Sequence, residues 1–181
     1  MARSIGGFKA QRGVTLTESL TAVTVLGVLL GVAVPSGLDM VHVTRLRGAA
    51  ETLVAELRHA MSESWRRNQG VSVSFREAGG GPGWCYGHRM DSACDCSVAG
   101  SCQLDGVDRV RLGSDYPGVT INAGISGSRF STQPKRSTVT AGNVLFTAAN
   151  GKQLKVVVTG YGRVRICSPS GNSQVGGYPP C

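Results

Sequence analysis

Near its beginning the chain carries a run of twenty residues, Ser19 to Leu38, without a charged side chain. As an α-helix this run would be about 30 Å long, which matches the hydrocarbon thickness of a bilayer. No small-residue cleavage site follows it, so it differs from a secretory signal peptide. The basic residues of the leader before it favour a cytoplasmic N-terminus: Arg3, Lys9 and Arg12. The sequence therefore predicts one membrane anchor, with the rest of the chain on the far side of the membrane.

A carboxylate, Glu18, stands directly before this apolar run. A carboxylate near lipid is costly unless it has a partner. It belongs to the stretch "RGVTLTE", residues 12–18, which resembles the class III signal of type IV prepilins and pseudopilins. The resemblance implies that prepilin peptidase cuts between Gly13 and Val14 and methylates the new N-terminus.

The same resemblance implies a role for Glu18, because in pilins this glutamate pairs with the N-terminal amine of a neighbouring subunit during assembly. Pro35 falls where pilins commonly carry a helix-kinking proline. Val14 is a departure, since phenylalanine usually follows the glycine. The alternative, a plain anchor whose Glu18 reaches the membrane interface, stays open.

Beyond the apolar run, a stripe of small and apolar residues recurs at spacings of three and four: Leu46, Ala50, Leu53, Leu57, Ala60 and Ser64. Charged residues mostly take the other positions, so this part should pack one face on a domain. Gly70 is expected to end the helix. We predict one helix from about 14 to 68. The chain then divides into a leader, 1–13, a transmembrane or filament-core segment, 14–38, and a periplasmic head, 39–181.

After Gly70 the period changes to two, beginning with "VSVSF" at 71–75. Further strands are expected at 108–112, 118–122, 137–140, 143–148, 153–159 and 162–167. The connection Gly160-Tyr161-Gly162 suits a hairpin. The chain has 26 glycines and only 6% aromatic residues, which favours a turn-rich β domain. The sequence predicts an α+β fold in which one long N-terminal helix packs on an antiparallel β-sheet head.

The six cysteines, an even number, suggest disulfides in an oxidising compartment. Residues 76–106 are expected to form a loop that holds Cys85, Cys94, Cys96 and Cys102. With His88 these could form a zinc site, but Cys-x-Cys spacing is poor for one. All pairings remain open; Cys94–Cys96 is disfavoured by strain, and Cys85–Cys94 with Cys96–Cys102 is preferred.

The remaining two cysteines, Cys167 and Cys181, are expected to pair with each other. Their disulfide would pin the Gly- and Pro-rich tail back to the last strand.

The net charge is +8 and it is unevenly distributed. No acidic residue follows Asp115, while seven basic residues do: Arg129, Lys135, Arg136, Lys152, Lys155, Arg163 and Arg165. Such a tract suggests an acidic partner, such as nucleic acid or anionic lipid. Ordinary charge on a solvated surface is the alternative.

Within this tract, "GYGRVRICSPSG" at 160–171 is the most informative stretch. On a strand, Arg163 and Arg165 would point to one face, about 7 Å apart, while Val164 and Ile166 face the core. Two neighbouring guanidiniums suit phosphate recognition. Lys152 and Lys155, on the adjoining strand, could extend this basic surface. Tyr161, at the turn, could stack on a base. The arginines could equally solvate the outer face of a sheet.

The prepilin-like start, the single long helix and the final strand together resemble the GspH/FimT family of type IV minor pilins and pseudopilins. Gly162, Arg163 and Arg165 are similar to the Gly-Arg-x-Arg motif of FimT-like minor pilins, which bind DNA for uptake in natural transformation. The resemblance implies that the partners are other pilin subunits, prepilin peptidase, DNA and, before assembly, the inner membrane. It also implies a single-pass inner-membrane protein that later enters a pilus or pseudopilus.

Two other roles stay open. One is structural: an H-type minor pseudopilin of a type II secretion system, or a pilin that primes filament assembly, without DNA contact. The other is an adhesin for anionic surfaces. An enzyme is not expected, because the sequence shows no catalytic motif and its histidines, His42, His59 and His88, stand far apart. No cofactor and no metal site are expected.

Overall fold

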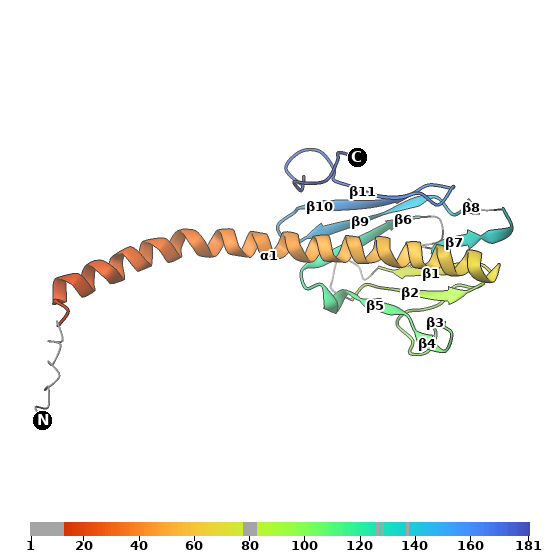
Figure 1. Ribbon diagram of the computed structural model, residues 1–181, viewed down its shortest axis with the longest axis horizontal. Coiled ribbons are helices and arrows are strands. Elements are labelled where there is room, and N and C mark those ends of the chain that lie inside the picture. The colour runs from red at the N-terminus through yellow and green to blue at the C-terminus, as the bar shows by residue number, and fades with distance from the viewer. Residues whose placement is uncertain (1–12, 78–82, 126, 128, 137) are drawn as a thin grey trace, which may run out of the picture. The chain divides into compact units, whose positions relative to one another are not determined.

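The computed structural model (Figure 1) describes residues 13–77, 83–125, 127, 129–136 and 138–181. The expected leader, apart from Gly13, lies outside the described residues, as do the side chains of residues 32–36 and of Arg136. The chain forms two units, residues 1–38 and 39–181, which are described separately.

In the first unit, residues 13–15 are not helical, and helix α1, Leu16–Arg67, begins directly after them. Glu18 lies in the first turn, where its backbone N–H donates to the Thr15 hydroxyl at 3.3 Å, an arrangement typical of a helix N-cap. Among the described residues, no helix has the length and apolar character that a membrane crossing requires. The anchor expected at 19–38 includes the undescribed side chains of 32–36, so the kink at Pro35 stays a prediction.

The second unit combines the rest of α1 with short strands. These are β1 Val71–Arg76, β2 Cys85–Met90, β3 Gln103–Leu104, β4 Val107–Asp108, β5 Val110–Leu112, β6 Val119–Gly124, β7 Arg129–Gln133, β8 Thr138–Val139, β9 Gly142–Ala148, β10 Gln153–Val158 and β11 Val164–Cys167. Short 3-10 turns lie at Gly113–Asp115 and Pro134–Arg136.

The strands form two larger antiparallel sheets and one small ribbon. One sheet has the order β5-β2-β1-β7-β8, the other β11-β10-β9-β6, and β3 pairs with β4. Figure 1 shows the head portion of α1 crossing in front of both sheets. The expected α+β architecture is therefore confirmed.

The stripe expected on α1 forms the helix side of the core. Its members from Leu46 to Ser64 are at most 2% exposed, and they pack on the apolar faces of both sheets. Between the sheets, Trp84 donates from Nε1 to the Val119 carbonyl oxygen at 2.7 Å, which satisfies the one polar atom of a buried indole.

The helix ends at Arg67, one residue before the predicted end at about 68. Arg67 is the last helical residue, and Asn68 takes the left-handed conformation at φ 51°, which asparagine tolerates better than most residues. The Gln69 N–H then donates to the Ser64 carbonyl oxygen at 3.2 Å. Gly70 is needed for a different reason: a Cβ there would lie 3.1 Å from the Thr132 carbonyl oxygen.

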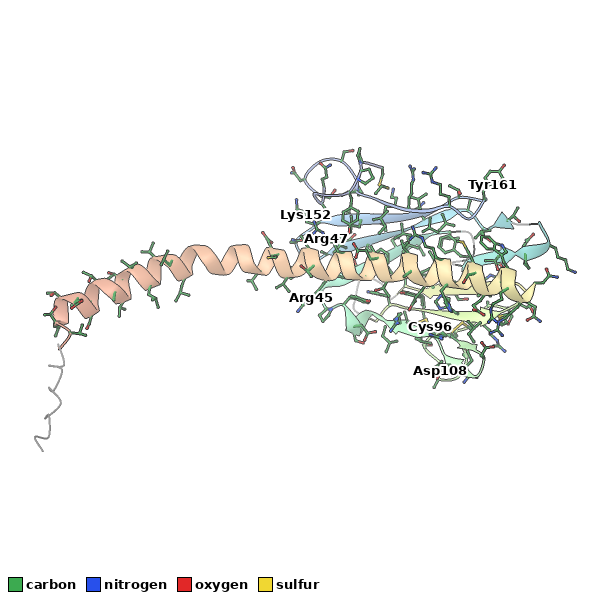
Figure 2. All side chains as sticks on the ribbon, in the orientation of Figure 1. Arg45, Arg47, Cys96, Asp108, Lys152 and Tyr161 are labelled. Carbon is green, nitrogen blue, oxygen red and sulfur yellow. A yellow bond between two sulfur atoms is a disulfide. The ribbon has the colours of Figure 1, made fainter. Side chains whose placement is uncertain are left out.

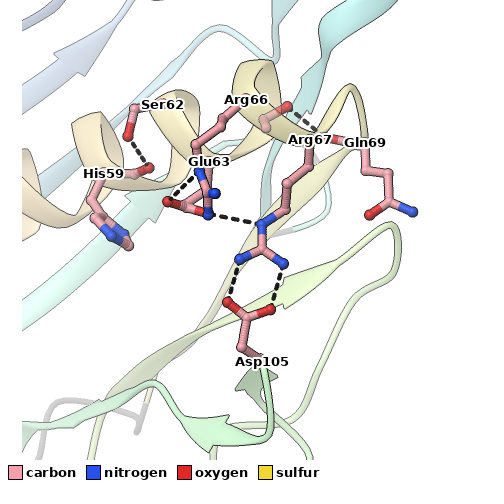
Figure 3. Close-up of polar contacts among 8 residues, drawn as sticks. His59, Ser62, Glu63, Arg66, Arg67, Gln69 and Asp105 are labelled. Carbon is pink, nitrogen blue, oxygen red and sulfur yellow. Dashed lines mark hydrogen bonds and ion pairs between the residues drawn. The ribbon is translucent and has the colours of Figure 1, made fainter.

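A charged network ties this helix end to the β3–β4 ribbon (Figure 3). Glu63 accepts from Arg66 at 2.6 Å and from Arg67 at 2.8 Å, and Arg67 also makes a two-pronged ion pair with Asp105. These hydrogen bonds, first that from Arg66, hold the pKa of Glu63 at about 2, against an ordinary value of 4.5.

The segment 76–106 is not the simple loop expected. It contains β2, which pairs with β1 over its full length, and the ribbon strand β3. Residues 78–82 of this segment lie outside the described part. The strand was missed because "CYGHRM" carries no alternation of apolar and polar residues, although most of its positions are buried by aromatic and helix neighbours.

The preferred cysteine pairs in this segment are wrong. The structure pairs Cys85 with Cys96 and Cys94 with Cys102. The chain turns back after β2, and this brings Cys96 rather than Cys94 next to Cys85. Cys167 bonds Cys181, the pair that the sequence favours.

Candidate nucleic-acid interface

The expected hairpin joins β10 to β11. The strands are antiparallel, with Val158 opposite Val164 and Val157 opposite Arg165. The turn is closed by the Thr159 N–H donating to the Arg163 carbonyl oxygen at 3.0 Å, and by the Gly162 N–H donating to the Thr159 carbonyl oxygen at 2.9 Å. Gly162 has φ 78°, a left-handed conformation that favours glycine.

Register places the two arginines on the outer face of the sheet. Val156, Val158 and Val164 are buried against the core, whereas Arg163 and Arg165 are exposed. Since side chains alternate along a strand, the two guanidiniums leave the same face. Among the described residues, neither side chain has an ion pair or a hydrogen bond. Both keep their donors available for an external anion.

The structure brings only one of the two expected lysines to this face. Lys155 lies on β10 opposite Cys167, and Val157, two residues later on β10, lies opposite Arg165. Lys155 therefore points to the same face of the sheet as Arg165. Lys152 precedes β10 at the other end of the sheet, where its Nζ donates to the Asn172 carbonyl oxygen at 3.0 Å. Figure 2 shows Lys152 and Tyr161 at opposite ends of this sheet. Lys152 therefore does not extend the arginine pair.

Two exposed aromatic side chains border the turn. Tyr161 is 90% exposed at its tip. Trp65, 52% exposed in the last turns of α1, lies beside Gly162: a Cβ on that glycine would be 3.9 Å from its Cζ2. Trp65 is not among the residues that the sequence predicted for this surface. The sequence feature that could have identified it is a large aromatic side chain directly after Ser64, the last residue of the buried stripe on α1.

The C-terminal tail fastens the strand that carries the arginines. Besides the Cys167–Cys181 disulfide, the Ser168 N–H donates to the Pro179 carbonyl oxygen at 2.8 Å. The tail also contacts α1, where Tyr178 donates its hydroxyl to Glu51 at 2.5 Å and lies beneath the Arg47 guanidinium. β11 is thus held by β10 along one side and by the tail at its end.

The rest of the described head offers no comparable site. No group of three or more His, Cys, Asp or Glu side chains within it could hold a metal ion. His88 is 5% exposed, and burial lowers its pKa, so the ring is neutral at pH 7. His42 and His59 lie on α1.

The profile of the family described as "Type II transport protein GspH" matches residues 49–175. The fold is similar to that of the minor pseudopilin EpsH from the type 2 secretion system of Vibrio cholerae, at 12% identity and a TM-score of 0.50. That match covers 71% of this chain and 99% of EpsH. The type IV minor pilin FimU of Pseudomonas aeruginosa is also similar, at 19% identity and a TM-score of 0.46. Here 68% of this chain and 88% of FimU are covered. No curated protein matches the chain.

The matched residues span the last part of α1, both sheets and the first part of the tail, which is well over half of the chain. The family consists of pilin-type structural subunits rather than enzymes, and it implies association with other pilin subunits. The chain therefore belongs to the GspH family of minor pilins and pseudopilins.

Proposed function

We propose that this minor pilin binds DNA without sequence preference through Arg163 and Arg165, as a step in DNA uptake during natural transformation. The observation that supports this most is the pair of exposed guanidiniums on one sheet face, which have no acidic partner in the described part of the chain. Lys155 adds a third cation to that face, and Tyr161 offers a ring for stacking.

The proposed affinity is electrostatic. Each guanidinium can donate two hydrogen bonds to a phosphate and displaces counterions from the DNA. With two phosphates neutralised, the logarithm of the binding constant should fall with the logarithm of salt concentration at a slope of about −1.8. A contact of this size is weak by itself, so several copies in one filament would raise it by avidity.

The N-terminus completes the proposal. Prepilin peptidase would cut between Gly13 and Val14 and methylate the new terminus, and Glu18 would pair with that amine of a neighbouring subunit. Residues 14–38 would anchor the subunit in the inner membrane before assembly into the filament core, with the head, 39–181, in the periplasm.

A gel-shift titration of the oxidised full chain in mild detergent with duplex DNA tests the site. The wild type should bind about tenfold more weakly at 200 mM than at 50 mM salt. Arg163→Ala/Arg165→Ala should lose this binding. The matched control is Arg89→Ala/Arg109→Ala, which removes the same charge from exposed positions outside this sheet and should bind like the wild type. Equal binding by both double variants would contradict the proposal.

A structural role as an H-type pseudopilin of a type II secretion system is the second candidate, favoured by the family description and by the likeness in fold to EpsH. It requires no DNA contact. If the folded wild type fails to bind DNA at low salt, this candidate is preferred. A strain with Arg163→Ala/Arg165→Ala that forms filaments normally but loses transformation would instead support DNA uptake.

A further inference from the structure

Strand β11 lies at the edge of its sheet, and the direction of its backbone groups follows from the hairpin register. The pair Thr159 and Arg163 is hydrogen-bonded, so the paired groups of β11 recur at every second residue, on Arg165 and Cys167. The N–H and C=O groups of Val164 and Ile166 consequently face away from β10. Among the described residues, these outward groups have no backbone partner.

The tail already pairs with this edge of the sheet at one position, directly after β11. The backbone N–H and C=O groups of Ser168 point outward like those of Val164 and Ile166. Ser168 pairs in parallel with Pro180 of the tail. Its N–H donates to the Pro179 carbonyl oxygen, and its carbonyl oxygen accepts from the Cys181 N–H at 3.1 Å. In the part of the chain that the structure describes, the outward groups of Val164 and Ile166 have no such partner.

A groove of about 250 Å³ lies between this open edge and α1. It is lined by Glu51, Val54, Ala55, Arg58, Arg165 and Ile166. Ile166 faces the core side of the sheet but is only half-buried, because no further strand covers it. Val54 supplies a buried apolar floor, and Glu51 already accepts from Tyr178. Arg58 and Arg165 outweigh the single carboxylate of Glu51, so the net charge of the groove lining is positive.

We propose that the β11 edge binds an extended peptide segment of a protein partner, in which apolar residues alternate with acidic ones. Such a strand would pair with the outward groups of Val164 and Ile166, as in other β-augmentation complexes. Its apolar side chains would cover Ile166 and Val54, while its acidic side chains on the opposite face would meet Arg165.

This proposal goes beyond DNA binding, although the two share Arg165. Duplex DNA offers no extended peptide backbone at strand spacing and no apolar side chain for the groove floor. The features that carry the proposal are the open backbone row and the half-buried Ile166, and neither is needed for phosphate contact.

The test uses the oxidised full chain in detergent and a fluorescent acetylated hexapeptide in which glutamate alternates with valine and isoleucine. Its scramble, with the glutamates adjacent, has the same charge. We expect the alternating peptide to bind at least tenfold more tightly than the scramble. Ile166→Pro should abolish this preference, because proline removes the outward N–H without breaking a β10–β11 bond. Ile166→Ala loses side-chain bulk but keeps the N–H, and should retain part of the binding.

Amide hydrogen exchange on the wild type provides a readout that does not depend on the folding of a variant. The alternating peptide should slow exchange at Val164 and Ile166, and leave the already paired amides of Arg165 and Cys167 unchanged. Equal binding of peptide and scramble, or unchanged exchange at Val164 and Ile166, would overturn the proposal. Protection of those amides by duplex DNA but not by the peptide would assign the edge to the DNA site and overturn it as well. Loss of DNA binding in Arg163→Ala/Arg165→Ala tests the proposed function separately.

Discussion

At the scale of single residues, the Gly-Arg-x-Arg stretch joins two different physical requirements. Arg163 and Arg165 are there for their charge and keep the same face because one residue separates them. Gly162 is there for its backbone: it has φ 78°, and a Cβ would lie 3.4 Å from Met61 Sδ and 3.5 Å from Val139 Cγ2. The glycine therefore sets where the hairpin turn lies against α1 and β8.

Gly162→Ala should destabilise the head by about 1–2 kcal/mol, the cost of holding an L-residue in the left-handed region. Gly151→Ala is the matched control for the backbone, since Gly151 has φ 79° with no atom near its Cβ position. Urea unfolding should show a loss for Gly162→Ala at least as large as for Gly151→Ala. A Gly162→Ala variant as stable as the wild type would show that the turn is not constrained in this way.

At the scale of elements, a network of ion pairs lies at the end of α1. The bonds from Arg66 and Arg67 keep the pKa of Glu63 low in the folded head. A carboxyl whose pKa falls on folding stabilises the folded state above its unfolded pKa, here about 4.5, and that contribution disappears as the pH falls towards about 2.

Thermal unfolding between pH 5 and pH 2 tests this network, with Glu63→Gln as the comparison. At pH 5 the wild type should melt at the higher temperature, because its carboxylate is ionised and paired. The difference should shrink as the pH falls, since the glutamine variant lacks this titration, and should vanish near pH 2. A difference that stays constant with pH would mean that the ion pairs do not contribute.

Elements with a clear period could be predicted from the sequence, and elements held by other means could not. The stripe from Leu46 to Ser64 repeats at helical spacing, so the helix and its buried face were predictable. β7, "RFSTQ", has one apolar side chain buried by its neighbours, and β2 has none of the expected alternation, so both escaped notice. The disulfides Cys85–Cys96 and Cys94–Cys102 depend on how β2 folds back, which spacing alone does not encode.

The candidate site was predictable for the same reason and to the same extent. Arg163 and Arg165 are close in sequence on one strand, so their shared face followed from strand geometry. Lys152 was misplaced because it lies before β10 begins, at the end remote from the turn. Trp65 reaches the turn from α1, a contact that exists only once the helix and hairpin have packed.

At the scale of the whole molecule, covalent closure supplements a core built from short strands. The Cys167–Cys181 bond closes a loop with a sequence separation of 14 residues. A loop of this size should contribute about 3 kcal/mol by restricting the unfolded chain.

Cys167→Ser/Cys181→Ser should therefore lower the free energy of unfolding by about 2–3 kcal/mol, measured by urea titration with the other disulfides intact. Cys181→Ser alone would leave a free thiol and serves less well. An unchanged midpoint and slope would show that the noncovalent contacts of the tail already suffice to hold it.

The hairpin geometry also determines how the head would respond to a pull. In Figure 1, β10 and β11 run roughly along the portion of α1 that packs on them. A load applied at Arg163 along that direction would stress the β10–β11 hydrogen bonds together in shear, whereas a load across it would open them one after another. At the far end of β11, the Cys167–Cys181 disulfide joins the strand covalently to the tail. A cargo held at this turn could therefore be drawn along the helix axis with the strand kept in place.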